Sequence, residues 1–297
     1  MEPMRRTKVP GGFLAPSDRL SGELFALTED WRDEFVDVLR RPNVVGLQLA
    51  KMSGWDGEDI KFVASLPPVL RSLELIGWWR PSIDVSPLYA HPELEHLVLQ
   101  CNYKKFDFSR LPVLGMCDVD WRRGADTILD CERLRFLSCR GFPHSDLAVL
   151  SSLRDLEELR VESRKLETVN GVEALNKLRH VSFIYCTSLA DISGLARVPT
   201  VETVKLHTCK QVEAIKSLPG LPALRTLHIE NCGEVRSVAG FDSARSLEEL
   251  FLIGISVHDG NLEPLTRAPR LRKVAIAKKR HHSHTSDEIQ QALDAKR

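Results

Sequence analysis

One pattern, apolar-x-x-apolar-x-apolar, recurs along most of this sequence and constrains its fold more than any other feature. Consecutive matches start 20 to 26 residues apart. A repeat of this length cannot bury its apolar edge alone, so the units must stack against one another into a solenoid. The eleven matches begin at Val44, Leu70, Leu94, Leu114, Leu134, Leu156, Leu178, Val201, Leu224, Leu247 and Leu271.

Two different periods follow each other inside every unit. The second half of the pattern alternates with period two, as in Val204 and Leu206, which predicts a short half-buried strand. The residues between strands repeat with period three, which favours 3₁₀ turns or extended segments over α-helix. One such run is Leu189, Ile192, Leu195 and Val198. Each unit is therefore expected to pair an inner strand with a tight outer return.

The position three residues after the last strand anchor holds Asn102, Cys186, Cys209 or Cys232 in four units. Asn can bond to backbone groups, and Cys is a small apolar residue with a weak S–H donor. We interpret these cysteines as structural residues rather than as metal ligands or nucleophiles. The seven cysteines include no C-x-x-C pair, and we expect reduced thiols in a cytoplasmic protein.

Units such as LRHVSFIYCTSLADISGLARVP resemble leucine-rich repeats of the short class, similar to internalin-like and phosphatase-regulator-like repeats. The resemblance spans residues 42–284. It implies an α/β solenoid, a horseshoe of about 11 coils with a parallel β-sheet on the concave face, 3₁₀ or extended returns on the convex face, and helical caps. The family shares an architecture rather than an activity.

The ends of a stacked array need caps. Residues 1–41 are expected to form a flexible leader followed by a capping helix over 28–41, for which docking to a partner is the alternative role. Residues 285–297 are expected to form a second capping helix, because Thr285 and Glu288 make a T-x-x-E capping box. The repeat array occupies residues 42–284 between them.

The charges and motifs restrict the function classes. Lys+Arg and Asp+Glu both number 41, and this balance argues against a dedicated nucleic-acid binder. A basic run from Lys278 to Arg280, followed by His281, His282 and His284, leaves a nucleic-acid-associated role open as an alternative. No apolar stretch reaches membrane-spanning length.

We found no nucleotide, hydrolase or metalloprotease motif, and we expect no enzyme activity, no cofactor, no metal and no small-molecule substrate. A catalytic site assembled across repeats remains the less favoured alternative.

The repeat phase predicts which side chains face the concave wall. In each strand these flank the buried anchors, and towards the centre of the array they carry charges of both signs, which suits specific binding of a protein. An aromatic group follows the strand ends, where tryptophan and tyrosine commonly anchor interfaces. Packing of these rings under the loops is the competing interpretation, and one of the adjacent Trp78 and Trp79 is expected to be exposed. The predicted partner-binding residues are Asp118, Asp120, Arg140, Arg160, Glu162, Lys205, His207, His228 and Glu230 on the wall, with Trp78, Trp79, Tyr103, Trp121 and Tyr185 beyond the strands.

The sequence therefore predicts a non-catalytic, cytoplasmic and bacterial protein-interaction scaffold that binds a protein partner on its concave face. An inhibitor or immunity-type role is one specific form of this hypothesis. Solvated strand faces with cross-strand ion pairs are the competing interpretation of the same residues.

Overall fold

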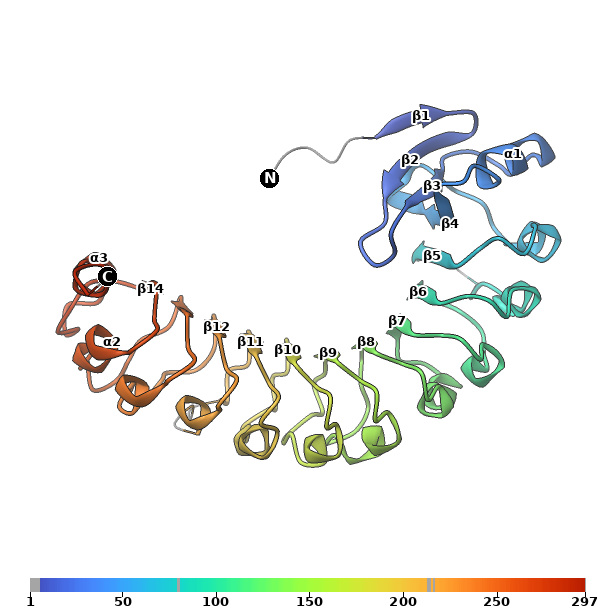
Figure 1. Cartoon of the computed structure of the whole chain (residues 1–297). Coiled ribbons are helices and arrows are strands. Elements are labelled where there is room, and N and C mark those ends of the chain that lie inside the picture. The colour runs from blue at the N-terminus through green and yellow to red at the C-terminus, as the bar shows by residue number, and fades with distance from the viewer. Residues whose placement is uncertain (1–5, 79–80, 213–214, 216, 297) are drawn as a thin grey trace. The chain divides into compact units, whose positions relative to one another are not determined.

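The computed structural model describes residues 6–78, 81–212, 215 and 217–296. It divides the chain into two compact units, Met1–Cys139 and Arg140–Arg297, which are treated separately below. In both units, strands line one side of each coil and short helical turns line the other (Figure 1).

In the first unit, β1 and β2 form an antiparallel hairpin, β2 continues antiparallel to β3, and the strands from β3 to β7 pair in parallel. The strands are β1 (Thr7–Val9), β2 (Gly12–Pro16), β3 (Glu23–Leu27), β4 (Val44–Ala50), β5 (Ser72–Gly77), β6 (His96–Cys101), β7 (Met116–Asp120) and β8 (Phe136–Arg140), whose last residue belongs to the second unit. The helical segments are α1 (Val36–Leu39) and 3₁₀ turns at Asp33–Phe35, Lys51–Ser53, Lys61–Ser65, Ser86–Ala90, Phe108–Arg110 and Ala125–Asp130.

In the second unit, β9 to β14 follow in sequence order and pair in parallel. The strands are β9 (Glu158–Glu162), β10 (His180–Ile184), β11 (Thr203–His207), β12 (Thr226–Glu230), β13 (Glu249–Ile253) and β14 (Lys273–Ile276). The helical segments are α2 (Glu263–Arg267), α3 (Ser286–Asp294) and 3₁₀ turns at Ala148–Ser152, Val172–Ala174, Ser193–Arg197, Leu218–Gly220 and Phe241–Ser243.

The repeat prediction is confirmed strand by strand, because β4 to β14 coincide with the eleven pattern matches. Their anchors are buried, as Leu159, Val161 and Leu227 illustrate. The period-three segments form 3₁₀ turns as expected, and α2 is an α-helical exception. Parallel pairing between equivalent residues gives the leucine-rich-repeat solenoid that the sequence predicted.

The cysteines stabilise the turns after the strands. The Cys186 Sγ–H donates to the Val161 carbonyl at 3.4 Å, and the Cys209 Sγ–H donates to the Phe183 carbonyl at 3.4 Å. All seven cysteines are buried and free of disulfides. In the repeat where Arg164 takes the cysteine position, Ser163 replaces this interaction. Its Oγ–H donates to the Phe142 carbonyl at 2.6 Å and its oxygen accepts the Lys165 and Leu166 N–H groups.

The N-terminal end differs from the expectation of a flexible leader and a helix over 28–41. Residues 7–27 hold three strands, and helical structure is confined to residues 33–39. Thr28 does not cap a helix, because its hydroxyl donates to the Gly11 carbonyl within the sheet. Apolar periodicity does not predict the pairing of β3 with β4, because hydrogen bonds between backbone groups hold the two strands together. The assignment of residues 1–41 as a cap stays a prediction.

At the other end, α3 has the predicted capping box, with the Thr285 side chain accepting the Glu288 N–H and the Glu288 carboxylate accepting the Thr285 N–H. Ile289 and Leu293 are buried. The helix packs beside β14 and α2 (Figure 1).

Candidate functional site

In the second unit the strand register places the predicted wall residues in two rows. Arg160, Ser182, Lys205, His228 and Phe251 are successive partners in one row, and Glu162, Ile184, His207, Glu230 and Ile253 are successive partners in the other. All ten side chains are half-buried or exposed. Because neighbouring parallel strands lie about 4.8 Å apart, five strands present a surface about 20 Å wide, which is the scale of a protein contact.

A carboxylate lies between two imidazoles near the middle of these rows. The Glu230 oxygens lie 3.4 Å from His228 Nε2 and 3.9 Å from His207 Nε2. Aromatic rings flank this group on both sides, with Tyr185 edge-on to His207 at 5.3 Å and Phe251 tilted against His228 at 5.4 Å. The three side chains are about one-third exposed, so the contacts between them contribute little to stability. The His228 Nε2 atom itself is buried.

Tyr185 stands directly after β10 with a left-handed backbone, φ +51°. The residues directly after β8, β11, β12 and β13 are Gly141, Thr208, Asn231 and Gly254, and all four have positive φ, whereas Ser163 after β9 does not. This conformation lets the residue's N–H reach the neighbouring coil, where the Tyr185 N–H donates to the His207 carbonyl at 2.8 Å. Glycine adopts it freely, whereas a bulky L-residue is strained. Tyr185 nevertheless presents a ring that is 49% exposed.

A pocket of about 530 Å³ lies beside this tyrosine. Gly141 contributes open space to it, because a side chain at that position would meet nothing within 4 Å. Phe142 forms an apolar base. The remaining lining residues are Pro143, Glu162, Ser163, Arg164, Lys165, Tyr185 and Thr187. The pocket therefore combines an aromatic wall with charges of both signs.

In the first unit, the equivalent wall is partly covered by residues 17–22, the turn between β2 and β3. The Arg19 guanidinium lies 3.5 Å from the centre of the Phe136 ring. Side chains that the repeat phase directs towards solvent are buried here, with Glu74 8% and His96 2% exposed. The expectation of one open concave wall is corrected for this unit, because the sequence pattern does not reveal where a distant turn will fold.

Burial beneath this turn perturbs two titratable groups. Burial raises the pKa of Glu74, and the carboxylates of Asp18 and Asp118 raise it further, while the amide of Gln48, at 2.7 Å, opposes them. Burial and the charge of Arg19 lower the pKa of His96 to about 4. His96 Nδ1 lies 2.8 Å from Ser72 Oγ and 4.0 Å from the Glu74 carboxylate. Both groups are therefore stabilised in their neutral forms.

The predicted residues after the first-unit strands separate into core and surface. Tyr103 is only 4% exposed and its hydroxyl donates to the Asp120 carbonyl at 2.8 Å, so it is a core residue rather than an exposed anchor. Trp121 is half-buried. Trp78 is 74% exposed, as expected for one of the two adjacent tryptophans, and Trp79 lies outside the described residues.

The acidic wall residues of the first unit are less accessible than expected. Asp120 is buried and its carboxylate lies 3.6 Å from Arg122, whereas Asp118 is half-buried. Arg140, at the start of the second unit, is also half-buried. The repeat phase had not singled out Met52, which is 93% exposed. Met52 and Trp78 each lie eight residues after the first anchor of their repeat, Val44 and Leu70, so the repeat spacing alone could have matched the two residues.

The basic C-terminal segment is tied to the preceding coil through its histidines. His281 Nε2 bonds to the Val257 carbonyl at 2.9 Å, and His282 Nε2 accepts the Val257 N–H at 3.3 Å. Lys278, Lys279 and Arg280 are exposed. Within the described ranges, no group of three or more His, Cys, Asp or Glu side chains is placed to hold a metal ion.

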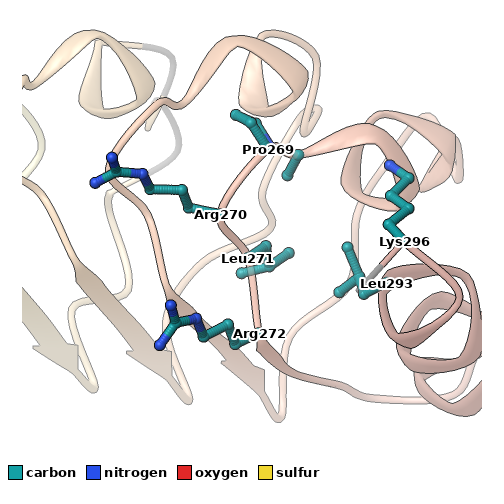
Figure 2. A pocket seen from close by; sticks show the side chains of 7 residues that line it. Pro269, Arg270, Leu271, Arg272, Leu293 and Lys296 are labelled. Atoms are coloured by element: carbon teal, nitrogen blue, oxygen red, sulfur yellow. The ribbon is translucent and has the colours of Figure 1, made fainter.

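A second pocket, of about 350 Å³, lies beside α3. Leu271 and Leu293 point towards each other at its base, whereas the side chains of Arg270 and Arg272 extend away from them (Figure 2). The guanidinium groups therefore do not converge on this pocket with Lys296. Among the described helices, none combines the length and apolar character needed to cross a membrane.

No protein-family model and no curated protein matches the sequence. Solved structures match its fold. An internalin, inlF, from Listeria monocytogenes matches with a TM-score of 0.59 and 14% sequence identity, and the match covers 92% of the present chain and 84% of the internalin chain. A plant peptide hormone receptor, RGFR1, solved in complex with RGF2, matches with a TM-score of 0.53 and 14% sequence identity. This match covers 89% of the present chain but only 47% of the receptor chain. The chain therefore has the leucine-rich-repeat solenoid fold, which it shares with this internalin.

Proposed function

We propose that this chain is a non-catalytic scaffold that binds a protein partner on the concave face of its second unit. The contact surface comprises Arg160, Glu162, Lys205, His207, His228 and Glu230, with Tyr185 as its aromatic anchor. This arrangement joins a central aromatic residue to surrounding charges of both signs, which favours specific orientation of a protein partner.

The observation that carries this proposal is the conformation of Tyr185. Strain at one residue is informative when a less strained residue would serve the fold equally well. Gly141 and Gly254 occupy the same repeat position as Tyr185 and adopt its backbone conformation. Tyr185 is half exposed rather than packed into the core, so its large side chain contributes more to the surface than to the hydrophobic interior.

The structural neighbours support the same class of function at a coarser level, since the plant receptor was solved with a peptide hormone bound. An inhibitor or immunity-type role is one form of our proposal. We place the protein in a bacterial cytoplasm, and its seven buried, unlinked cysteines are compatible with a reducing compartment. A catalytic site is not favoured, because the wall groups lie on an open surface rather than in a closed cleft.

A capture experiment tests the proposal. Immobilised wild type, Arg160→Glu/Lys205→Glu and Tyr185→Ala chains are incubated with lysate of the source cells, and retained proteins are quantified by mass spectrometry. Arg154→Glu/Arg245→Glu is the matched control, because both arginines are exposed and lie outside the two rows. Far-UV circular dichroism verifies that every variant is folded.

We expect one protein to be retained by wild type and control, and to be lost by about tenfold or more in the other two chains. Equal retention by all four chains would place the contact elsewhere. The alternative, a nucleic-acid-associated role for the segment Lys278–His284, predicts nucleic acid in the eluate instead, lost steeply with added salt and in a Lys278→Glu/Lys279→Glu chain.

A further inference from the structure

Two of the most exposed apolar side chains of the first unit lie at equivalent positions in adjacent coils. Met52 is 93% and Trp78 74% exposed. Ala50 and Ile76 are partners in the register of β4 and β5, and each of the two side chains follows two residues later. Tryptophan and methionine are enriched in the cores of protein interfaces. The register itself ends at Ala50 and Ile76, but the 3₁₀ turn Lys51–Ser53 that holds Met52 packs against β5. The two exposed apolar side chains therefore belong to one contact surface rather than being scattered.

Cations lie in the two coils that follow Trp78. The Arg122 guanidinium lies 5.9 Å from the centre of the Trp78 ring and is held in place by the Cys101 carbonyl at 3.1 Å and the Asp120 carboxylate at 3.6 Å. The backbone of Lys104 is bonded to the segment that follows Trp78, because its N–H donates to the Ile83 carbonyl at 2.9 Å. Lys105 packs against Gly124, beside Arg123.

Three of these cations are available to a ligand. Lys104, Lys105 and Arg123 are exposed and lie in none of the ion pairs found among the described residues. The charge of Lys104 is partly offset by the nearby Asp84 carboxylate. Arg122 is already paired with Asp120, so it does not supply free charge. We call the surface formed by Met52, Trp78, Lys104, Lys105, Arg122 and Arg123 the apolar–basic edge.

We propose that the apolar–basic edge binds an acidic protein segment that inserts one apolar side chain between Met52 and Trp78. The three available cations complement carboxylates, and the flexible thioether of Met52 adapts to an aliphatic or aromatic side chain. Nucleic acid fits less well, because three cations neutralise few phosphates and the whole chain carries no basic excess. This surface lies in the first unit and does not depend on the concave face of the second.

A peptide selection tests the proposal. A phage library of random 12-residue peptides is panned on the wild-type full chain, in parallel with Trp78→Ala and Tyr185→Ala chains. Enriched peptides are synthesised with a fluorescent label and their dissociation constants are measured by anisotropy. A second pair of chains, Lys104→Glu/Lys105→Glu and Lys278→Glu/Lys279→Glu, compares the edge with an exposed basic pair of the second unit. A labelled 12-residue oligothymidylate serves as the nucleic-acid probe.

We expect a family of peptides with net negative charge and at least one large apolar residue. Their affinity should fall at least about tenfold in Trp78→Ala and in Lys104→Glu/Lys105→Glu, and stay within about twofold in Tyr185→Ala and Lys278→Glu/Lys279→Glu. Absence of a family that depends on Trp78, enrichment of basic peptides, or tighter binding of the oligothymidylate would overturn the proposal. Binding that fails only in Tyr185→Ala would instead concern the concave face.

Discussion

Replacing Tyr185 with glycine separates a structural role of this residue from a role in binding. The left-handed backbone of Tyr185 costs about 1 kcal/mol, and glycine removes this cost. Against this, glycine loses about 0.7 kcal/mol more through unfolded-state entropy. The edge-on contact with His207 contributes roughly another 0.5 kcal/mol. Loss of the buried half of the side chain costs about a further 1 kcal/mol, so Tyr185→Gly should lower the free energy of unfolding by about 1 kcal/mol.

The measurement is urea unfolding of wild type and variant, followed by far-UV circular dichroism, with the m-value checked for a change in cooperativity. Tyr103→Gly is the contrasting variant, because Tyr103 is buried and its hydroxyl is hydrogen-bonded; truncation there should cost about 3–5 kcal/mol. A loss above about 2 kcal/mol for Tyr185→Gly would refute the reasoning, since the ring would then be needed by the fold.

Three further predictions follow from the described contacts. Arg19→Ala should remove the cation–π contact with Phe136, which is worth about 1 kcal/mol. It should also speed the amide hydrogen exchange of β5 and β6, which lie beneath the 17–22 turn. Unchanged exchange would mean that the turn does not cover this face. The folded-state pKa of His96 is lowered to about 4, so the neutral imidazole stabilises the first unit above pH 6.5, and this stability, up to roughly 3 kcal/mol, is lost as the pH falls from 6.5 towards 4. His96→Gln should flatten this pH dependence of the free energy of unfolding in urea titrations. A slope that is retained in the variant would contradict the assignment to His96. Ser163→Ala leaves a carbonyl and two N–H groups without the buried hydroxyl and should lower stability by about 2 kcal/mol. Ser151→Ala, at an exposed position of the preceding 3₁₀ turn, should change stability little, and equal effects of the two substitutions in thermal unfolding would argue against the Ser163 contacts.

The sequence predicted the repeats well because their pattern is local. Each anchor is buried by its own coil and its neighbours, so residues such as Leu159 and Leu227 can be located from spacing alone. The same phase placed Lys205, His207, His228 and Glu230 correctly in two rows, because register in a solenoid repeats with the unit.

Contacts between distant segments account for what the sequence did not reveal. Glu74 and His96 have the phase of wall residues, yet the 17–22 turn covers them. Tyr103 and Trp78 both follow strands, but Tyr103 packs in the core with its hydroxyl bonded to the Asp120 carbonyl, whereas Trp78 is exposed. The left-handed position of Tyr185 is likewise invisible in composition, because the residue there is not glycine.

The most direct test of the concave-face account is photo-crosslinking at Tyr185 in the source cells. The tyrosine is replaced by p-benzoylphenylalanine, and the same residue is introduced at Ala196, an exposed position in a 3₁₀ turn of the second unit. The account predicts one covalent adduct with another protein from position 185 and none from position 196. No adduct from position 185, or the same adducts from both positions, would contradict it.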